Sequence, residues 1–230
     1  MIKTNTNIII IISLMNALIF DTETTGLPKK RCASIKDDAN WPHIVQMSWV
    51  HCNIETGKII SIKDYIIRLR DGLTIPPSST KIHGITNEIM QEKGVSIKQV
   101  LEDFRKDLMQ SQYLVAHNLD FDKTITRIEM YRNGYHNFYK RHKCIEVCTM
   151  RDGTDLCNIT YVNKWNNRFE TKPPKLIELY QILFNETPEN LHNSLIDVFV
   201  CLRCFYKMLC NRDIFRDNPV FKRQCQRVFS

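Results

Sequence analysis

The chain has 230 residues, 43% of them hydrophobic, which is enough apolar material for one domain of α/β size with a sizeable core. No low-complexity tract or internal repeat is evident, so fibrous and repeat architectures are excluded. The formal net charge of +7 favours a polyanionic partner, although a charge of this size is too common among soluble proteins to identify nucleic acid by itself.

The first residues imitate a secretory signal, because Lys3 precedes a short apolar stretch over residues 8–20. The stretch is too short to span a membrane, and its removal would delete a predicted strand. We therefore expect an apolar extension over residues 1–14 and a domain that begins near Met15, which is a second candidate for the start of translation. A membrane-tethered protein is the alternative that the run Ile8–Ile12 favours.

Three apolar, β-branched runs predict the first strands, and they cover residues 18–20, 44–50 and 59–69. Gly57 lies in the turn between the last two runs, which predicts an antiparallel meander. The next segment, residues 79–86, follows a pair of prolines and resembles a short turn.

The rest of the chain alternates between helices and a strand. A short buried strand is predicted at 113–116, and helical spacing of apolar residues covers 96–109, 122–131, 175–184 and 193–210. Strands followed by strand–helix alternation predict an α/β fold in which helices pack on a mixed sheet. Residues 211–230 are polar and basic and form either a loosely attached tail or a further short helix, so we expect the domain to cover residues 15–210.

Nine cysteines are scattered through these elements rather than spaced as a disulfide framework. Their odd number and scatter predict a reducing, intracellular setting, with a cytoplasmic location as the simplest interpretation. Cys201 and Cys204 have C-x-x-C spacing, yet they lie in an apolar helical pattern. We therefore expect structural burial there rather than a redox or zinc role.

The first predicted strand ends in two acids, Asp21 and Glu23, just before a Thr-Thr-Gly segment. Side chains at positions i and i+2 of a strand point to the same face, so both carboxylates leave one face at the end of the strand. Adjacent anions repel each other unless a cation lies between them, and hard divalent ions such as Mg²⁺ bind oxygen ligands of this kind. Two solvated acids would be the simpler interpretation of an isolated pair, so the metal interpretation depends on ligands from elsewhere in the chain.

Two later segments supply such ligands. Asp120 and Asp122 follow the short strand at 113–116, so their carboxylates emerge at a strand end, where open α/β sheets build their sites. Asp197 opens the last predicted helix on its core-facing side, and an acid among apolar residues needs a partner, such as a metal ion, to stay charged. His192 lies just before that helix, on a loop that could swing over the metals.

Four motifs, FDTETTGL, IHGIT, HNLDFD and HNSLIDV, resemble those of the DnaQ-like 3′→5′ exonucleases, the histidine branch of the DEDD superfamily. They occur in the family's order and spacing and span residues 20–197. The resemblance implies an RNase H-like fold, a mixed β-sheet in which an antiparallel meander precedes parallel strands and helices flank the sheet. One departure is Ser194, where many relatives carry alanine; because serine is also small, we expect the site to keep its geometry.

The resemblance implies metal-binding carboxylates at Asp21, Glu23, Asp122 and Asp197, and a general base at His192. It selects Asp122 rather than Asp120 because the family's third acid follows an aromatic residue, here Phe121. Asp120 is then expected to be a solvated neighbour or a cap for the following helix.

Phosphodiester hydrolysis explains why these residue types occur together. Two divalent cations, Mg²⁺ with Mn²⁺ as a substitute, can activate a water and stabilise the leaving 3′-oxygen. Four carboxylates offset the charge of the ions. An imidazole with a reference pKa of about 6.5 can take the water's proton near neutral pH.

The resemblance also implies contacts to the terminal nucleotide from Thr24, Gly26, Leu27, His83 and Phe121. The first three would place backbone and an apolar wedge against the last base, and Phe121 would stack on a base. Each of the five has a structural alternative as a turn former or a core residue. His117 and Asn118 are expected to shape the turn between strand and helix rather than to bind metal.

The implied activity is that of a metal-dependent 3′→5′ exonuclease that releases nucleoside monophosphates from single-stranded or frayed 3′ ends, with DNA favoured. An exoribonuclease is the first alternative, because RNA and DNA differ at the 2′-hydroxyl and no residue in the sequence indicates which of the two is preferred. The second is a non-catalytic nucleic-acid-binding or polymerase-accessory module, which the intact catalytic set disfavours. An active proofreading subunit bound to a polymerase stays open. A polymerase or a second copy of the chain is a candidate partner, and no membrane partner is expected.

Overall fold

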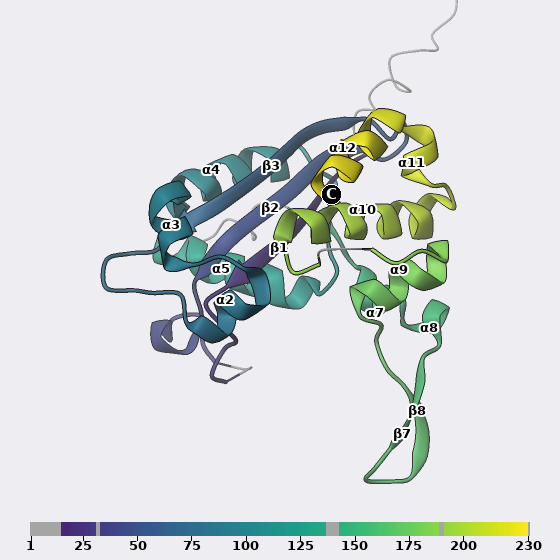
Figure 1. Ribbon diagram of the computed structural model, residues 1–230, viewed down its shortest axis with the longest axis horizontal. Helices are drawn as coiled ribbons and strands as arrows, with labels where there is room; N and C mark the ends of the chain where they lie inside the picture. Colours follow the sequence, from purple (N-terminus) through teal and green to yellow (C-terminus); the bar gives the residue numbers. More distant parts are fainter. Residues whose placement is uncertain (1–14, 31–32, 137–142, 189–190, 230) are drawn as a thin grey trace, which may run out of the picture.

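The computed structural model describes residues 15–30, 33–136, 143–188 and 191–229, and its centre is a six-stranded sheet (Figure 1). The strands follow the order β4-β3-β2-β1-β5-β6 across the sheet. Their bounds are β1 Asn16–Thr24, β2 Ile44–Asn53, β3 Ile59–Arg68, β4 Val95–Ser96, β5 Tyr113–Ala116 and β6 Ile145–Cys148.

The first three strands form an antiparallel meander, which confirms the prediction from the sequence. Gly57 takes a positive φ of 67° in the turn before β3, a backbone conformation that glycine adopts without the steric cost of a Cβ atom. On the other side of β1, strands β5 and β6 run parallel to it. The carboxyl ends of β1, β5 and β6 therefore lie at one edge of the sheet, and the predicted mixed sheet is confirmed.

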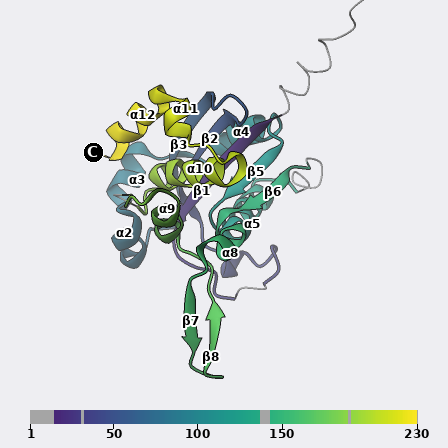
Figure 2. The ribbon, with the colours of Figure 1, turned by 90° about the vertical axis from the view of Figure 1, so that its right-hand side faces the viewer.

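Helices cover both faces of this sheet (Figures 1 and 2). α4 (Ile97–Leu108) and α5 (Leu119–Arg132) pack on one face, and α10 (Ser194–Cys210) crosses the other. Alternation along β1 assigns its side chains to the two layers. Phe20 contacts the α4–α5 layer, whereas Ile19 contacts the layer that contains α10.

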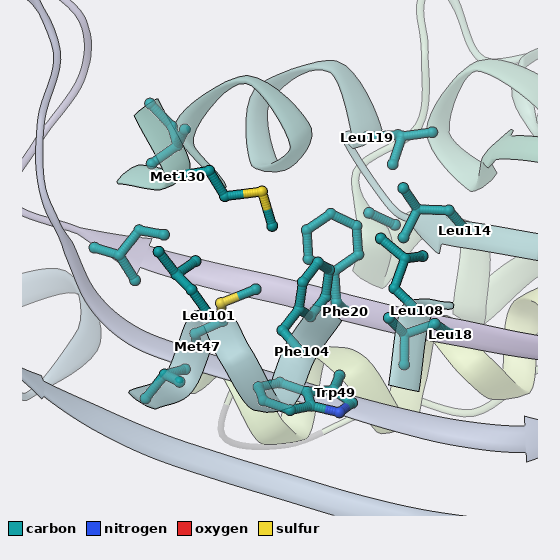
Figure 3. Close-up of a cluster of buried hydrophobic side chains, with 14 of the residues drawn as sticks. Leu18, Phe20, Met47, Trp49, Leu101, Phe104, Leu108, Leu114, Leu119 and Met130 are labelled. Atoms are coloured by element: carbon teal, nitrogen blue, oxygen red, sulfur yellow. The ribbon is translucent and has the colours of Figure 1, made fainter. Parts of the chain in front are cut away.

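An aromatic cluster fixes the α4–α5 layer on the sheet (Figure 3). The ring centroids of Phe20 and Phe104 lie 5.3 Å apart, and Trp49 packs edge-on against Phe104 at 5.5 Å. The indole N–H of Trp49 donates to Asp107 at 2.8 Å, so its polar atom is satisfied at the margin of the core. All three rings are fully buried, and each contributes about 1.5–3 kcal/mol to folding. The cluster thereby anchors β1, whose far end carries Asp21.

The prediction of a turn at residues 79–86 was wrong, because a helix, α2 (Pro77–His83), occupies most of the segment. Pro77 suits the first helical turn, since its fixed φ is helical and it has no N–H to leave unpaired. Gly84 ends the helix with a φ of 74°, and its N–H bonds back to the last turn at 2.8 Å. A helix this short offers too few apolar positions for its period to be recognised in the sequence.

The longer predicted helices are confirmed, with one shifted boundary. The segments predicted at 96–109, 175–184 and 193–210 correspond to α4, α9 (Leu176–Phe184) and α10. α5 begins at Leu119 rather than at residue 122, so Asp122 lies in its first turn. Several shorter elements had no counterpart among the predictions: η1 Asp38–Asn40, α3 Asn87–Lys93, β4, β6, α7 Thr149–Asp152, α8 Thr154–Cys157, β7 Thr160–Asn163, β8 Arg168–Thr171 and α11 Ile214–Asp217.

The C-terminal segment, for which the sequence left a loose tail and a short helix open, is helical and packs on the domain. Its last helix is α12 (Pro219–Phe229), in which Phe221 and Cys225 are fully buried. The ring of Phe221 packs edge-on against Phe199 of α10 at 5.3 Å between centroids. Most of the basic residues of this segment are exposed, while its apolar side chains extend the core layer beneath α10.

The expectations about the N-terminal extension, a membrane span and the cysteines can be compared with the described residues only. The predicted extension, residues 1–14, lies outside the described residues. Within the described part of the chain, no helix is both long enough and apolar enough to cross a membrane. The eight described cysteines are free thiols, and both Cys201 and Cys204 are buried along α10.

Candidate active site

Three carboxylates converge where β1 ends beneath the first turn of α10. Asp21 and Glu23 leave β1 on the face that Ile19 uses to pack against the α10 layer, as the alternation of the strand predicts. Asp197 extends from α10 to the same place, and one carboxylate oxygen of each of the three acids lies within 4.8 Å of those of the other two. The cluster therefore joins residues from opposite ends of the sequence.

Specific polar contacts hold α10 in this place. The side chain of Asn193 caps the helix by accepting hydrogen bonds from the N–H groups of Leu195 and Ile196. Ser194 Oγ donates to the carbonyl oxygen of Asp21 at 2.8 Å, and its N–H donates to Gln46 Oε1 at 3.3 Å. The helix start is thus tied to β1 and β2 beside the acids.

The electrostatics of the cluster are unfavourable without a cation. Burial raises the pKa of Asp21 to about 7. Burial, followed by repulsion from the neighbouring acids, raises the pKa of Glu23 to about 9 and that of Asp197 to about 8. Each shift has the direction expected when anions share a poorly solvated site.

One buried atom points to what the cluster would hold. Asp197 Oδ2 accepts the N–H of His192 at 3.2 Å, but Asp197 Oδ1 is buried and has no hydrogen-bond partner among the described residues. A buried carboxylate oxygen without a partner is costly. A divalent cation bound by these oxygens would supply the missing partner and offset the repulsion, so the residues present fit a metal ion.

Asp122 approaches the same acids from the other face of the sheet. It lies in the first turn of α5, is almost fully buried, and accepts from both the N–H and the hydroxyl of Thr22, at 3.1 and 2.8 Å. Burial and then repulsion from Asp21 raise its pKa well above the usual range. It stands outside the trio whose oxygens lie within 4.8 Å. Asp120, the competing candidate, is exposed on α5.

His192 reaches the site through its backbone. The residue is exposed and has a positive φ of 72°, which is uncommon for a residue with a side chain. Its N–H donates to Asp197, as described above, so the loop and α10 meet at the carboxylates.

Four of the five residues expected to contact the nucleotide gather around the end of β1. The hydroxyl of Thr24 donates to the carbonyl of Gly26 at 2.7 Å, and Leu27 next to this turn is 80% exposed. His83 is buried at the end of α2, where its pKa is lowered by burial and partly restored by the backbone of Thr24. Phe121 is half-buried and packs against the core cluster of the α4–α5 layer, which is the structural role left open for it.

Sequence reasoning missed the residues that support the acids rather than join them. Gln46 is buried in β2, and apart from its bond to Ser194 it donates to Asp64 at 2.8 Å. The only signal available was a polar residue near the start of a largely buried strand. His117, which was expected to shape the turn after β5, bonds instead to more distant segments, to Thr149 at 3.0 Å and to the carbonyl of Pro174 at 3.1 Å.

Comparison with known proteins agrees with this geometry. A family model described as Exonuclease (RNase_T) matches residues 18–205. The DNA polymerase III subunit epsilon of Buchnera aphidicola is 25% identical over 210 residues, which cover 88% of this chain and 77% of that protein. A DNA polymerase III subunit epsilon-like protein of Rhodobacter capsulatus is 34% identical over 110 residues, which cover 48% of this chain and 14% of that protein.

Solved structures share the fold. The complex of E. coli exonuclease I with a dT13 oligonucleotide superimposes with a TM-score of 0.64 at 17% identity. The match covers 84% of this chain but only 41% of that one, so the chain spans about four tenths of the exonuclease I length. At this identity the likeness shows the fold alone. The family match extends over most of the chain, however, and the chain therefore belongs to the exonuclease (RNase_T) family, whose DnaQ-like 3′→5′ members its motifs resemble.

Proposed function

We propose that this protein is a metal-dependent 3′→5′ exonuclease that hydrolyses phosphodiester bonds at the 3′ ends of DNA and releases nucleoside monophosphates. Family membership supports the reaction class. The observation that carries the proposal is the trio of Asp21, Glu23 and Asp197, in which one Asp197 oxygen is buried and has no partner within the part of the chain that the structure describes. A purely structural acidic cluster would have a cationic side chain or hydrogen-bond donors at that oxygen.

The carboxylates would hold divalent cations. Asp21, Glu23 and Asp197 offer oxygens to a common point, and Asp122 would complete the set from α5. Four carboxylates carry the charge that balances two divalent ions, and all-oxygen ligands favour Mg²⁺, with Mn²⁺ as a substitute. When bound, such ions lower the pKa of a water and stabilise the leaving 3′-oxygen of the phosphodiester.

His192 would act as the general base. Its exposed position on the loop before α10 leaves the imidazole able to meet a water at the scissile phosphate, and histidine is the side chain that most often transfers protons in general base catalysis. The bond from its N–H to Asp197 ties the position of the base to that of a metal ligand. Thr24, Gly26 and Leu27, with His83 beside them, would position the last nucleotide.

DNA is the favoured substrate, and a polymerase is a candidate partner. The Buchnera relative is named as a subunit of DNA polymerase III, the Rhodobacter relative is named as similar to that subunit, and exonuclease I has been solved with DNA oligonucleotides. The free thiols of the eight described cysteines support an intracellular, reducing setting.

Digestion of matched single-stranded DNA and RNA tests the proposal. We expect a 3′-labelled DNA strand to release labelled mononucleotide at once with Mg²⁺ or Mn²⁺, a 5′-labelled strand to shorten stepwise, and EDTA to stop both reactions. Faster digestion of RNA would replace DNA by RNA as the substrate. Absence of metal-dependent release from either strand would refute the nuclease.

A further inference from the structure

A small hairpin projects from the domain and carries exposed aromatic residues. β7 and β8 form a two-stranded antiparallel sheet of their own, and in both views they stand away from the helices and the main sheet (Figures 1 and 2). Trp165 at the tip is 99% exposed, and Phe169 on β8 is 79% exposed. Large aromatic side chains dominate binding energetics when they are buried, so two rings presented to solvent on one short hairpin indicate an interaction surface.

The tip is held in a defined shape by its polar residues. Glu170 accepts hydrogen bonds from the Tyr161 hydroxyl at 2.9 Å and from the side-chain amides of Asn163 and Asn166 at 2.8 and 2.9 Å. The N–H of Trp165 in turn donates to the side chain of Asn163 at 2.9 Å. The hairpin therefore presents Trp165 on an organised turn, which reduces the entropy lost on binding.

The charge of the tip is positive. Lys164 immediately precedes Trp165 and Arg168 immediately precedes Phe169, and both cations are exposed. Glu170, the acid of the hairpin, is occupied by the three donors named above, and within the described part of the chain neither cation has an ion pair. Aromatic rings interleaved with unpaired cations are the combination that binds single-stranded nucleic acid, through base stacking and phosphate contacts.

The base of the hairpin is fastened to the end of the sheet where the acids lie. β6 runs parallel to β5 and β1, and α7 and α8 lead from its carboxyl end into β7. Pro174, just after β8, accepts from the ring of His117, which follows β5 directly. Lys172 forms an ion pair with Glu178 of α9 at 2.6 Å. The hairpin thus extends from the same edge of the sheet as Asp21.

We propose that Trp165 and Phe169, with Lys164 and Arg168, bind single-stranded nucleic acid on the 5′ side of the end that is hydrolysed. From Thr160 to Trp165 the extended chain reaches about 17 Å at about 3.3 Å per residue. A stacked strand covers that length with about five nucleotides at about 3.4 Å each. The hairpin therefore holds only substrates longer than this, and the inference rests on the proposed function for the identity of the hydrolysed end.

Kinetics with thymidine oligonucleotides of different lengths test the inference. We expect Trp165→Ala to raise KM for a 20-mer about fivefold or more, because the variant loses the stacking of one base on an aromatic ring. The same variant keeps kcat and leaves hydrolysis of a trimer and of thymidine 5′-(4-nitrophenyl phosphate) unchanged. Trp165→Phe restores most of the affinity, since a ring remains. Lys164→Gln and Arg168→Gln should also raise KM for the 20-mer, whereas Lys98→Gln, the matched control at an exposed cation of α4, should leave it unchanged.

Binding without hydrolysis separates this inference from the proposed activity. In EDTA, the 20-mer should quench the emission of Trp165, because the other two tryptophans, Trp41 and Trp49, are buried. Trp165→Ala should weaken binding of a fluorescent 20-mer about fivefold or more. An inactive wild-type protein that still shows this difference would refute the nuclease and retain the binding surface. Equal binding and equal KM for wild type and Trp165→Ala would overturn the inference and assign the rings to a protein partner.

Discussion

At the scale of single residues, the site is organised around an unsatisfied carboxylate. Asp197 is fixed on one side by the N–H of His192, while its other oxygen is buried and has no hydrogen-bond partner among the described residues. Burial raises the pKa of all four acids that meet there, and repulsion between carboxylates adds to the rise for Glu23, Asp122 and Asp197. Such an arrangement costs stability and is retained where a ligand relieves it.

The choice of the third acid can be tested by two substitutions on α5. Asp122→Asn should reduce hydrolysis more than about 100-fold, since even residues that merely support metal ligands cost about 10- to 100-fold. Asp120→Asn, the matched control on an exposed position of the same helix, should leave the rate close to that of wild type. Initial rates on a labelled DNA strand decide the point. If only the Asp120 variant loses activity, the third metal-binding acid is Asp120 and not Asp122.

The role of His192 is tested by separating rate from affinity. His192→Gln should lower kcat by about 10²- to 10⁴-fold, the usual contribution of a general base, with little change in KM. Steady-state kinetics on single-stranded DNA measure both. A rise in KM with an unchanged kcat would show that the residue binds substrate and does not move a proton.

At the scale of elements, the sequence predicted those whose period is long enough to recognise. Alternation along β1 correctly placed Asp21 and Glu23 on one face, because the side-chain period of a strand is fixed. α2 was missed because its helical form depends on Pro77 and Gly84 at its ends rather than on an apolar stripe. The β7–β8 hairpin was missed because its rings are exposed and so follow no burial pattern.

Supporting contacts were beyond prediction for a different reason. Ser194 and Gln46 meet only when α10 crosses the sheet, and they lie 148 residues apart in the chain. No local pattern records such a pair. The order of the four motifs nevertheless brought Asp197 to Asp21 correctly, because their spacing reflects this same crossing of the sheet.

The join between β5, α7 and the hairpin base predicts a pH effect on stability. Burial lowers the pKa of His117 to about 4, so its ring is neutral in the fold and donates to the Pro174 carbonyl. The unfolded chain takes up a proton at about pH 6.5. Between pH 6.5 and 4 the unfolded state thus binds more protons, and the free energy of unfolding falls by up to about 1.4 kcal/mol per pH unit as the pH is lowered.

Urea unfolding of wild type and His117→Gln measures this effect. Glutamine can still donate to Pro174 but does not titrate, so the stability of the variant should depend less on pH within the window and should rise relative to that of wild type as the pH is lowered towards 4. Identical pH dependence in the two proteins would mean that His117 is not the group responsible.

At the scale of the whole molecule, the site lies where the two helical layers meet the same edge of the sheet. α5 contributes Asp122 from one face of the sheet, and α10 contributes Asp197 from the other. Each of these two acids lies in the first turn of its helix. The partial positive charge at a helix start favours anions there. Two helix starts offset only part of the charge of four carboxylates, and the remainder calls for cations.

Calorimetric titration with Mn²⁺ tests this central claim most directly. The account predicts saturable binding to the metal-free wild-type protein, loss of that binding in Asp197→Asn, and its retention in Asp120→Asn, whose carboxylate is exposed on α5. Binding of equal strength in all three proteins, or no binding to wild type, would contradict a metal site built from these acids.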